Sequence, residues 1–268
     1  MVLVGGHESA GGADLAFLQD EEPGIIISTS GRPLHNQLTQ LMQAGEGPVV
    51  VVPMTFGRNP TFVADTAKTL KWLAEGAGNR LVLADAFGTA DHLTAWLRTA
   101  AGEVRKRDPK AALVISAEAA NPFDDAELYR IAHLVRVHGA GNVVEVAVTQ
   151  KESDLGDVLH RLRLLGSSRA VIVPAGFQRE SPVPFGSGGF EGARFYGPLM
   201  SSRAVLQVIG ERTGAALHGL SHGRTGIAAG LQADHGHGYA HSHAFEESQG
   251  GGHRHPHTHG VQPAVPTH

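Results

Sequence analysis

The sequence reads VVPMTFGRNP at residues 51–60 and IVPAGFQRE at residues 172–180. Each stretch has a short apolar run that ends in proline, then a phenylalanine and, two residues later, an arginine. A second pair of similar stretches lies upstream of each, LVGGHE at residues 3–8 and VISAEA at residues 114–119. Segments that recur in the same order are typical of a duplicated unit. The repeats therefore predict two similar lobes.

Apolar runs rich in Val, Ile and Leu alternate along the chain with amphipathic stretches. Such runs suit strands buried on both faces of a parallel sheet, and each amphipathic stretch would cover that sheet as a helix. The sequence predicts an α/β protein with two doubly wound parallel-sheet lobes, residues 1–108 and 109–217. The expected strands are Val2–Val4, Gly24–Ile27, Val49–Val52, Leu81–Leu83, Ala112–Ser116, Val143–Val148 and Ala170–Val173. The expected helices are Leu34–Gln43, Pro60–Glu75, Asp91–Arg105, Asp124–His138, Leu155–Leu165 and Ser201–Leu217.

The chain changes character after Leu217. Residues 218–268 are rich in glycine and histidine and lack sustained apolar periodicity, which predicts a tail that is disordered without a ligand. Alternating histidines in such a chain can wrap Co²⁺, Ni²⁺ or Zn²⁺ with neutral imidazoles. We expect the tail to store or deliver metal. Its expected ligands are His235, His237, His241, His243, His253, His255, His257 and His259.

The composition narrows the range of partners. A formal net charge of -4 provides no basic excess for nucleic acid. Cysteine is absent, so any metal must bind to nitrogen or oxygen. No apolar run approaches the roughly 20 residues that span a bilayer, and residues 1–6 are typical of a strand rather than a signal peptide. We therefore expect a cytoplasmic protein that contacts neither nucleic acid nor membrane.

Polar residues follow the first strand of each predicted lobe. His7 and Glu8 follow the strand of the first lobe, and the repeat places Glu118 at the position equivalent to His7 in the second. Ligands of open parallel sheets bind beyond the carboxyl ends of the strands, so His7 and Glu118 are expected to face one another across a cleft. An imidazole opposite a carboxylate can hold a divalent metal and accept a proton. The alternative is that both are solvated loop residues.

Arg58 and Arg179 occupy equivalent positions in the two repeated stretches. Guanidinium groups bind carboxylates bidentately and stay charged at any relevant pH. If both arginines line the cleft, they predict an anionic ligand that carries carboxylates. The alternative is a pair of ordinary surface arginines.

Several runs in the second half of the chain are more specific: NPFDDAELYRIA (121–132), VEVA (144–147), LHRLRLLG (159–166) and AVIVP (170–174). Together they resemble the second half of the CbiX-type sirohydrochlorin cobaltochelatases, the class II chelatases of cobalamin and sirohaem biosynthesis. The opening run GHES (6–9) is similar to the Gly-His-Gly-Ser opening of that family, in which the histidine handles the metal.

The resemblance implies that the chain inserts Co²⁺, or Ni²⁺, into sirohydrochlorin or a related tetrapyrrole, without ATP and without an organic cofactor. His7 would be the metal ligand, and Glu118 or Glu8 would accept the pyrrole protons. Arg58 and Arg179 would bind the carboxylates of the tetrapyrrole. Histidine-rich tails are also familiar in this family. The resemblance leaves the oligomeric state open.

The chain also departs from the family pattern. The family carries another histidine after the strand that corresponds to Val49–Val52, whereas residues 56–60 here read FGRNP. Residues 10–20 replace a longer helix, and SAE at residues 116–118 stands where a Gly-Arg-Gly-Ser-like turn is expected. These departures keep open a non-catalytic metal chaperone or sensor on a degenerate chelatase scaffold. A nucleotide-dependent transferase would rest on the α/β class alone.

Overall fold

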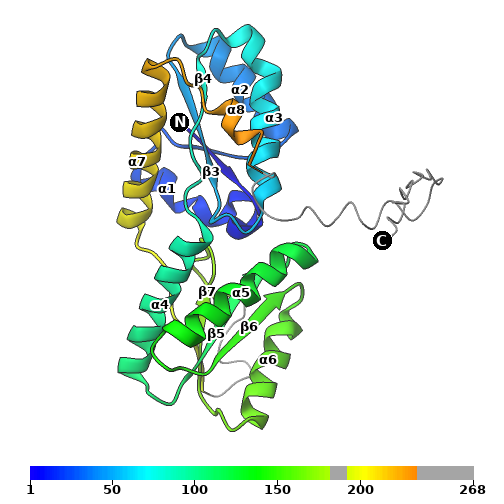
Figure 1. Cartoon of the computed structure of the whole chain (residues 1–268), viewed down its shortest axis with the longest axis vertical. Helices are drawn as coiled ribbons and strands as arrows, with labels where there is room; N and C mark the ends of the chain where they lie inside the picture. The colour runs from blue at the N-terminus through cyan, green and yellow to red at the C-terminus, as the bar shows by residue number, and fades with distance from the viewer. Residues whose placement is uncertain (182–191, 234–268) are drawn as a thin grey trace, which may run out of the picture. The chain divides into compact units, whose positions relative to one another are not determined.

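A computed structural model describes residues 1–181 and 192–233 of the chain. Figure 1 traces the order of the helices and strands through these residues. The expected metal ligands of the tail, from His235 to His259, lie outside the described residues. Within the described residues, no helix is long and apolar enough to cross a bilayer.

The protein is α/β, as predicted, and has two four-stranded parallel sheets flanked by helices. The strand orders are β2-β1-β3-β4 and β6-β5-β7-β8, so the two sheets share one topology. The first sheet comprises β1 (Val2–Gly5), β2 (Ile26–Thr29), β3 (Val49–Met54) and β4 (Leu81–Leu83). The second sheet comprises β5 (Ala112–Glu118), β6 (Val144–Thr149), β7 (Ala170–Pro174) and β8 (Ala193–Phe195).

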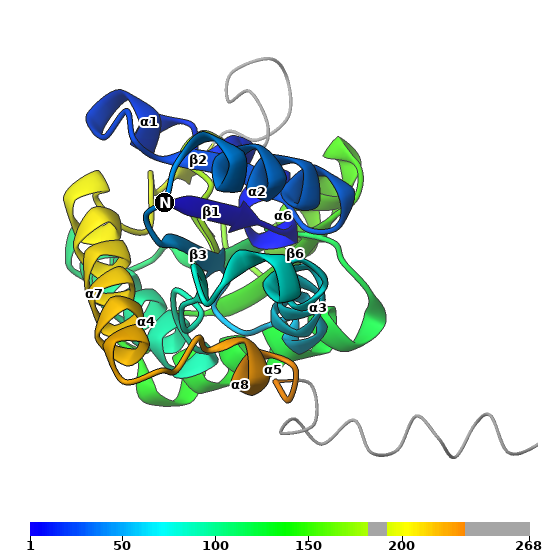
Figure 2. The same cartoon turned by 90° about the horizontal axis from the view of Figure 1, so that it is seen from above.

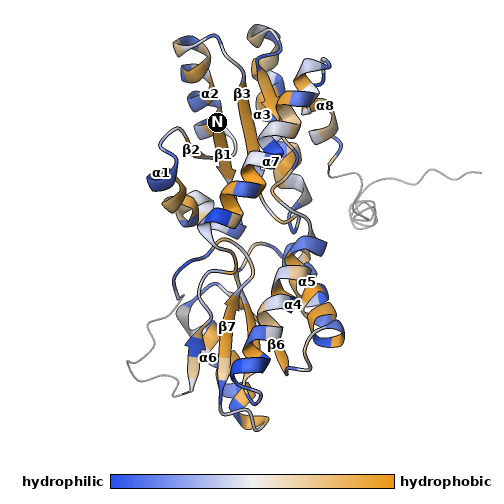
Figure 3. Ribbon diagram, turned by 90° about the vertical axis from the view of Figure 1, so that its left-hand side faces the viewer, coloured by the Kyte–Doolittle hydropathy of each residue, from blue (hydrophilic) through white to orange (hydrophobic). Residues whose placement is uncertain are grey.

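The central strands are buried on both faces, which is why their sequences are continuously apolar (Figure 3). One face of each sheet contributes to a common core cluster, which includes Leu3 of β1 and Ile115 of β5. The opposite faces pack against separate helices. Val2 of β1 packs in one cluster with Leu38 of α2, whereas Val114 of β5 packs in another with Leu159 of α6.

The register of the sheets corrects the predicted match between β1 and β5. Val4 pairs with the proline of β3, and Ser116 pairs with the proline of β7. Because the two prolines are repeat equivalents, Val4 corresponds to Ser116, and Glu118 corresponds to Gly6 rather than to His7. The predicted match was therefore off by one residue. Strands that are apolar on both faces carry no alternation that would fix their alignment.

The helices begin where the sequence supplies side chains that cap their first turns. Asn59 accepts a hydrogen bond from the backbone of α3, Thr89 caps α4 in a capping box with His92, and Asn121 caps α5. The helices between the strands are α2 (Arg32–Ala44), α3 (Pro60–Ala77), α4 (Ala90–Arg107), α5 (Pro122–His138) and α6 (Glu152–Leu164). The region predicted to lack a long helix forms the 3-10 helix η1 (His7–Leu15) and the short α1 (Phe17–Glu21).

The chain returns to the first sheet after β8. Helix α7 (Ser202–Ser221) packs on β3 and β4, and α8 (Ile227–Gly230) packs on α3 and β4 (Figures 1 and 2). The backbone N–H of Leu83 donates to the carbonyl of Thr225, which fixes this segment against β4. This arrangement differs from the predicted boundaries of the two lobes and the tail. Residues 202–217 cover the first sheet rather than the second, and residues 218–233 belong to the folded body rather than to a disordered tail.

Three phenylalanines pack together from the loops that follow β3, β4 and β7. The repeat equivalents Phe56 and Phe177 stack with their ring centroids 5.3 Å apart and an interplanar angle of 24°. Phe87 meets both rings edge to face, at 5.3 and 5.0 Å. All three side chains are buried in the common core cluster. Aromatic contacts of this geometry stabilise the junction beyond the effect of the buried area alone.

Candidate functional site

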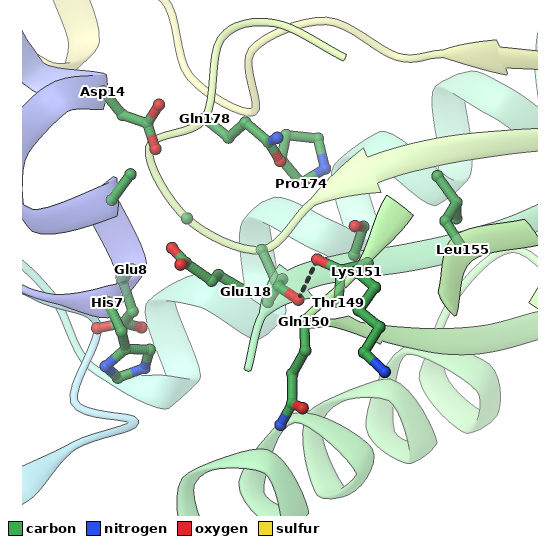
Figure 4. A pocket seen from close by; sticks show the side chains of 15 residues that line it. His7, Glu8, Asp14, Glu118, Thr149, Gln150, Lys151, Leu155, Pro174 and Gln178 are labelled. Carbon is green, nitrogen blue, oxygen red and sulfur yellow. Dashed lines mark hydrogen bonds between the residues drawn. The ribbon is translucent and has the colours of Figure 1, made fainter. Parts of the chain in front are cut away.

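A pocket of about 450 Å³ lies at the carboxyl ends of strands from both sheets (Figure 4). Its lining includes His7, Glu8 and Asp14 of η1, Glu118 at the end of β5 and Lys151 before α6. This position agrees with the rule for open parallel sheets. The pocket is in the size range of small-molecule sites. The structure therefore brings His7 and Glu118 to one pocket, as the sequence predicts, although they are not repeat equivalents.

Glycines place His7 at the pocket. A Cβ atom on Gly5, the last residue of β1, would lie 2.4 Å from the Cα atom of Gly12. Gly11 and Gly12 have φ values of 64° and 101°, in the left-handed region that favours glycine. Helix η1 can therefore fold back closely over the end of β1. This fold-back directs the side chains of residues 7 and 8 toward the second sheet.

The His7 imidazole is suited to binding a metal. Its Nε2 atom is buried and has no hydrogen-bond partner among the described residues. Burial and, secondarily, the Arg58 guanidinium lower the pKa of His7 from 6.5 to about 4. The ring is therefore neutral near pH 7, and neutral imidazole is the form that binds divalent transition metals.

The lowered pKa predicts a pH-dependent contribution of His7 to stability. In the unfolded chain the ring takes up a proton below pH 6.5, whereas the folded ring does so only near pH 4. The folded state therefore loses stability as the pH falls between these values, by about 2 kcal/mol at pH 5. Denaturant unfolding of the wild type and His7→Gln at pH 7.5 and pH 5 isolates this effect. The stability difference between the two proteins should shift by that amount in favour of the variant, and an unchanged difference would contradict it.

Glu8 ties the two repeated loops together. Its Oε2 accepts hydrogen bonds from the Thr55 hydroxyl and from the backbone N–H of Phe56, the latter at 2.9 Å. Its backbone carbonyl accepts from the N–H of Phe177 at 3.0 Å. Burial raises the pKa of the Glu8 carboxyl, while Arg58 and the two hydrogen bonds to the side chain oppose the rise. Because one oxygen is bound in this way, Glu8 is better placed to hold the loops that form the pocket than to accept a proton from a substrate.

Two carboxyl groups form an acidic side of the pocket. Glu118 is exposed at the end of β5, and the half-buried Asp14 lies near it. Burial raises the pKa of the Asp14 carboxyl, and the charges of Glu118 and Glu180 raise it further. A cation bound here would relieve the repulsion between the carboxylates. Asp14 was not among the expected site residues, because nothing in residues 10–20 predicts a 3-10 helix that faces the second sheet.

Arg58 does not line the pocket. Its side chain is fully buried, with Nη2 3.9 Å from Oδ1 of Asp125, and its charge acts on His7, Glu8 and Asp124. Gly57, with a φ of 81°, turns this loop inward. The predicted position beside a tetrapyrrole is therefore wrong. Arg58 instead compensates buried carboxylates between η1 and the start of α5.

Arg179 also does not line the pocket. Its guanidinium carbon lies 3.9 Å from the centroid of the Phe17 ring in α1, a cation–π contact. The equivalent positions of the two arginines in the sequence repeat therefore do not correspond to equivalent surroundings. The predicted pair of carboxylate-binding arginines is not assembled in this structure.

Among the described residues, Lys151 is the cationic side chain that lines the pocket, and it was not one of the expected site residues. It stands immediately before α6 and is exposed. Asp154 accepts hydrogen bonds from the backbone N–H groups of Gln150 and Lys151, at 2.7 and 2.8 Å, and so fixes this turn. The lysine side chain forms no salt bridge within the described part of the chain. The only sequence signal was its position after β6.

Within residues 1–181 and 192–233, no three His, Asp or Glu side chains lie close enough together to hold a metal ion by themselves. Comparison of the chain with known protein families and with curated proteins finds no match. The resemblance to the chelatases therefore rests on the sequence runs quoted above. What the pocket offers chemically is a neutral imidazole, an acidic side and a single lysine.

Proposed function

We propose that this protein inserts a divalent metal, Co²⁺ or Ni²⁺, into sirohydrochlorin or a related carboxylated tetrapyrrole, without ATP. The observation that carries the proposal is the convergence of the neutral His7 side chain and the Glu118 side chain on one pocket. The resemblance of residues 121–174 to the CbiX-type chelatases supplies the substrate class. The reaction would take place in the cytoplasm, and the protein would contact neither nucleic acid nor membrane.

The proposed roles follow from the charge balance of the reaction. Insertion joins the metal dication to the macrocycle and releases two pyrrole N–H protons for each metal bound. His7 would hold the cation through Nε2 while the metal exchanges water for pyrrole nitrogens. Glu118, with Asp14 beside it, would accept the departing protons and pass them to solvent. The histidines of residues 235–259 would raise the local metal concentration by tethering.

Lys151 would take the role predicted for the two arginines. Sirohydrochlorin carries eight carboxylates, so a ligand whose ring faces His7 presents carboxylates around its periphery. The acidic side of the pocket repels them, whereas the Lys151 ammonium attracts them. The macrocycle would therefore bind with one carboxylate-bearing edge toward Lys151, at the start of α6. Its ring nitrogens would face His7 and Glu118.

Replacing Lys151 with methionine should weaken the binding of metal-free sirohydrochlorin roughly 5–10-fold, because the side chain keeps its length but loses its charge. Absorbance titration of the full-length protein measures this affinity. Lys151→Arg should restore most of it. Lys110→Met is a matched control, since Lys110 is exposed just before β5, at the opposite end of that strand from Glu118. Equal affinities for wild type and Lys151→Met would remove Lys151 from the site.

The alternative function, a metal chaperone or sensor, is favoured by the loop at residues 56–60, which lacks the histidine of the chelatase pattern. Anaerobic mixing of metal-free protein, Co²⁺ and sirohydrochlorin, without ATP, separates the two functions. A chelatase converts the visible spectrum of the macrocycle to that of its metal complex much faster than a protein-free control. A chaperone or sensor binds Co²⁺ and leaves the rate at the control value.

A further inference from the structure

Two histidines lie one helical turn apart at the end of α7. His218 is in the last turn, and His222 is the C-cap residue. Residues four apart on a helix lie on the same face. Both side chains are exposed, and their rings meet edge to face with centroids 4.8 Å apart. The pocket described above includes neither of them.

The spacing of the rings suits two ligands of one metal ion. With a metal–nitrogen bond of about 2.1 Å, each ring centroid lies about 3.2 Å from the ion. Neighbouring ligands at angles of about 90–110° then place the centroids about 4.5–5.2 Å apart. The observed 4.8 Å falls within this range, and rotation of the exposed rings about their Cβ–Cγ bonds would aim one nitrogen of each ring at the shared ion. Two histidines at i and i+4 on a helix are also the arrangement by which helical zinc motifs supply two of their ligands.

The C-terminal end of α7 also favours a bound cation. The partial negative charge at the C-terminus of a helix stabilises cations within the last turn. The hydroxyl of Ser221 donates to the carbonyl of His218 at 2.7 Å, which helps to hold this turn. A cation bound by the two rings would therefore lie on a structured helix end rather than on a freely moving chain.

This site would be remote from the pocket. Thr213, in the same half of α7, donates a hydrogen bond to the sulfur of Met1 at 3.1 Å, directly before the start of β1. His7 follows the other end of that strand. We infer that His218 and His222 form a second divalent-cation site on the folded body, selective for late first-row metals such as Ni²⁺, Co²⁺, Cu²⁺ and Zn²⁺. Water would complete the coordination, and Mg²⁺ would bind poorly because it prefers oxygen ligands.

The test uses the full-length, metal-free protein and Ni²⁺ alone. Histidines are modified with diethyl pyrocarbonate at increasing Ni²⁺ concentrations, and mass spectrometry reads each site separately. His218 and His222 should lose reactivity together, whereas His160, exposed on α6 without a histidine four residues away, should keep it. Mg²⁺ should protect neither. In His222→Ala, the Ni²⁺ concentration that protects His218 should rise roughly 10-fold or more, because the second tethered ligand is lost.

Two results would overturn this inference. One is that His218 and His222 stay as reactive as His160 at Ni²⁺ concentrations that fully protect the histidines of residues 235–259. The other is that His218 remains equally protected in His222→Ala, which would mean that the two rings do not share an ion. Neither result depends on tetrapyrrole chemistry, so the inference and the proposed function can fail separately.

Discussion

His7→Ala is expected to lower the rate of Co²⁺ insertion into sirohydrochlorin by roughly 100-fold or more, since direct coordination of the ion contributes several kcal/mol to such a reaction. The His7 side chain lines the pocket, and its low pKa keeps the imidazole neutral throughout the physiological range. The measurement is a single-turnover absorbance assay at saturating metal. Saturation removes any contribution of residues 235–259 to local metal supply.

The variant should remain folded. His7 follows the end of β1, and the hydrogen bonds that tie the loops together come from Glu8 rather than from His7. Circular dichroism and thermal unfolding check this point. His160→Ala serves as the matched control, because His160 is exposed on α6. Insertion by His7→Ala at the wild-type rate would remove His7 from the reaction.

Gly176→Ala is expected to destabilise the protein strongly. A Cβ atom at this position would lie 2.4 Å from the carbonyl oxygen of Glu8. The same carbonyl accepts the hydrogen bond from the N–H of Phe177, so the loop cannot move away without losing that bond and the stacking of Phe56 on Phe177. We expect a loss of about 3 kcal/mol, which corresponds to roughly 6–12 °C in Tm.

Because Gly176 also lines the pocket, the same variant should weaken insertion. Gly210→Ala is the matched control. A Cβ atom on Gly210, in the middle of α7, would meet no atom within 4 Å. Alanine is the better helix former, so this variant should gain up to about 1 kcal/mol. Calorimetry of both variants tests the contrast in sign. A Tm for Gly176→Ala equal to that of the wild type would show that the two loops do not approach so closely.

The order of the elements was largely predictable because each strand and helix carries a local signal. All seven predicted strands and six predicted helices form, with ends that differ by a few residues. The capping residue Asn121, before two acidic residues, marks the start of α5 in both sequence and structure. Four short elements without such signals, η1, α1, β8 and α8, were not predicted.

The packing and alignment of elements that are far apart in the sequence were less predictable. The periodicity of residues 202–217 shows that they form an amphipathic helix, but not which sheet that helix covers. The apolar runs of β1 and β5 fit one another in more than one alignment, so the predicted match slipped by one residue. Arg58 and Arg179 share a position in the repeat, yet the backbone of Gly57 turns one inward and Phe17 of α1 holds the other.

The candidate site was predictable in part for the same reason. The carboxyl ends of parallel strands lie at the same edge of each sheet, and both sheets present these edges to the pocket, which is why His7, Glu8 and Glu118 line it together. Asp14 and Lys151 reach it through η1 and the turn before α6, whose directions depend on tertiary packing. The sequence therefore predicted the centre of the pocket, but not the groups that give it an acidic side and a cationic one.

The proposed insertion depends on a divalent metal bound between His7 and Glu118, and anomalous diffraction from crystals of the full-length protein soaked in Co²⁺ detects such an ion. We expect an anomalous peak in the pocket about 2.1 Å from Nε2 of His7, on the side that faces Glu118. The peak should be lost in His7→Ala. Cobalt peaks elsewhere on the protein, with none at His7, would contradict the proposed role of His7.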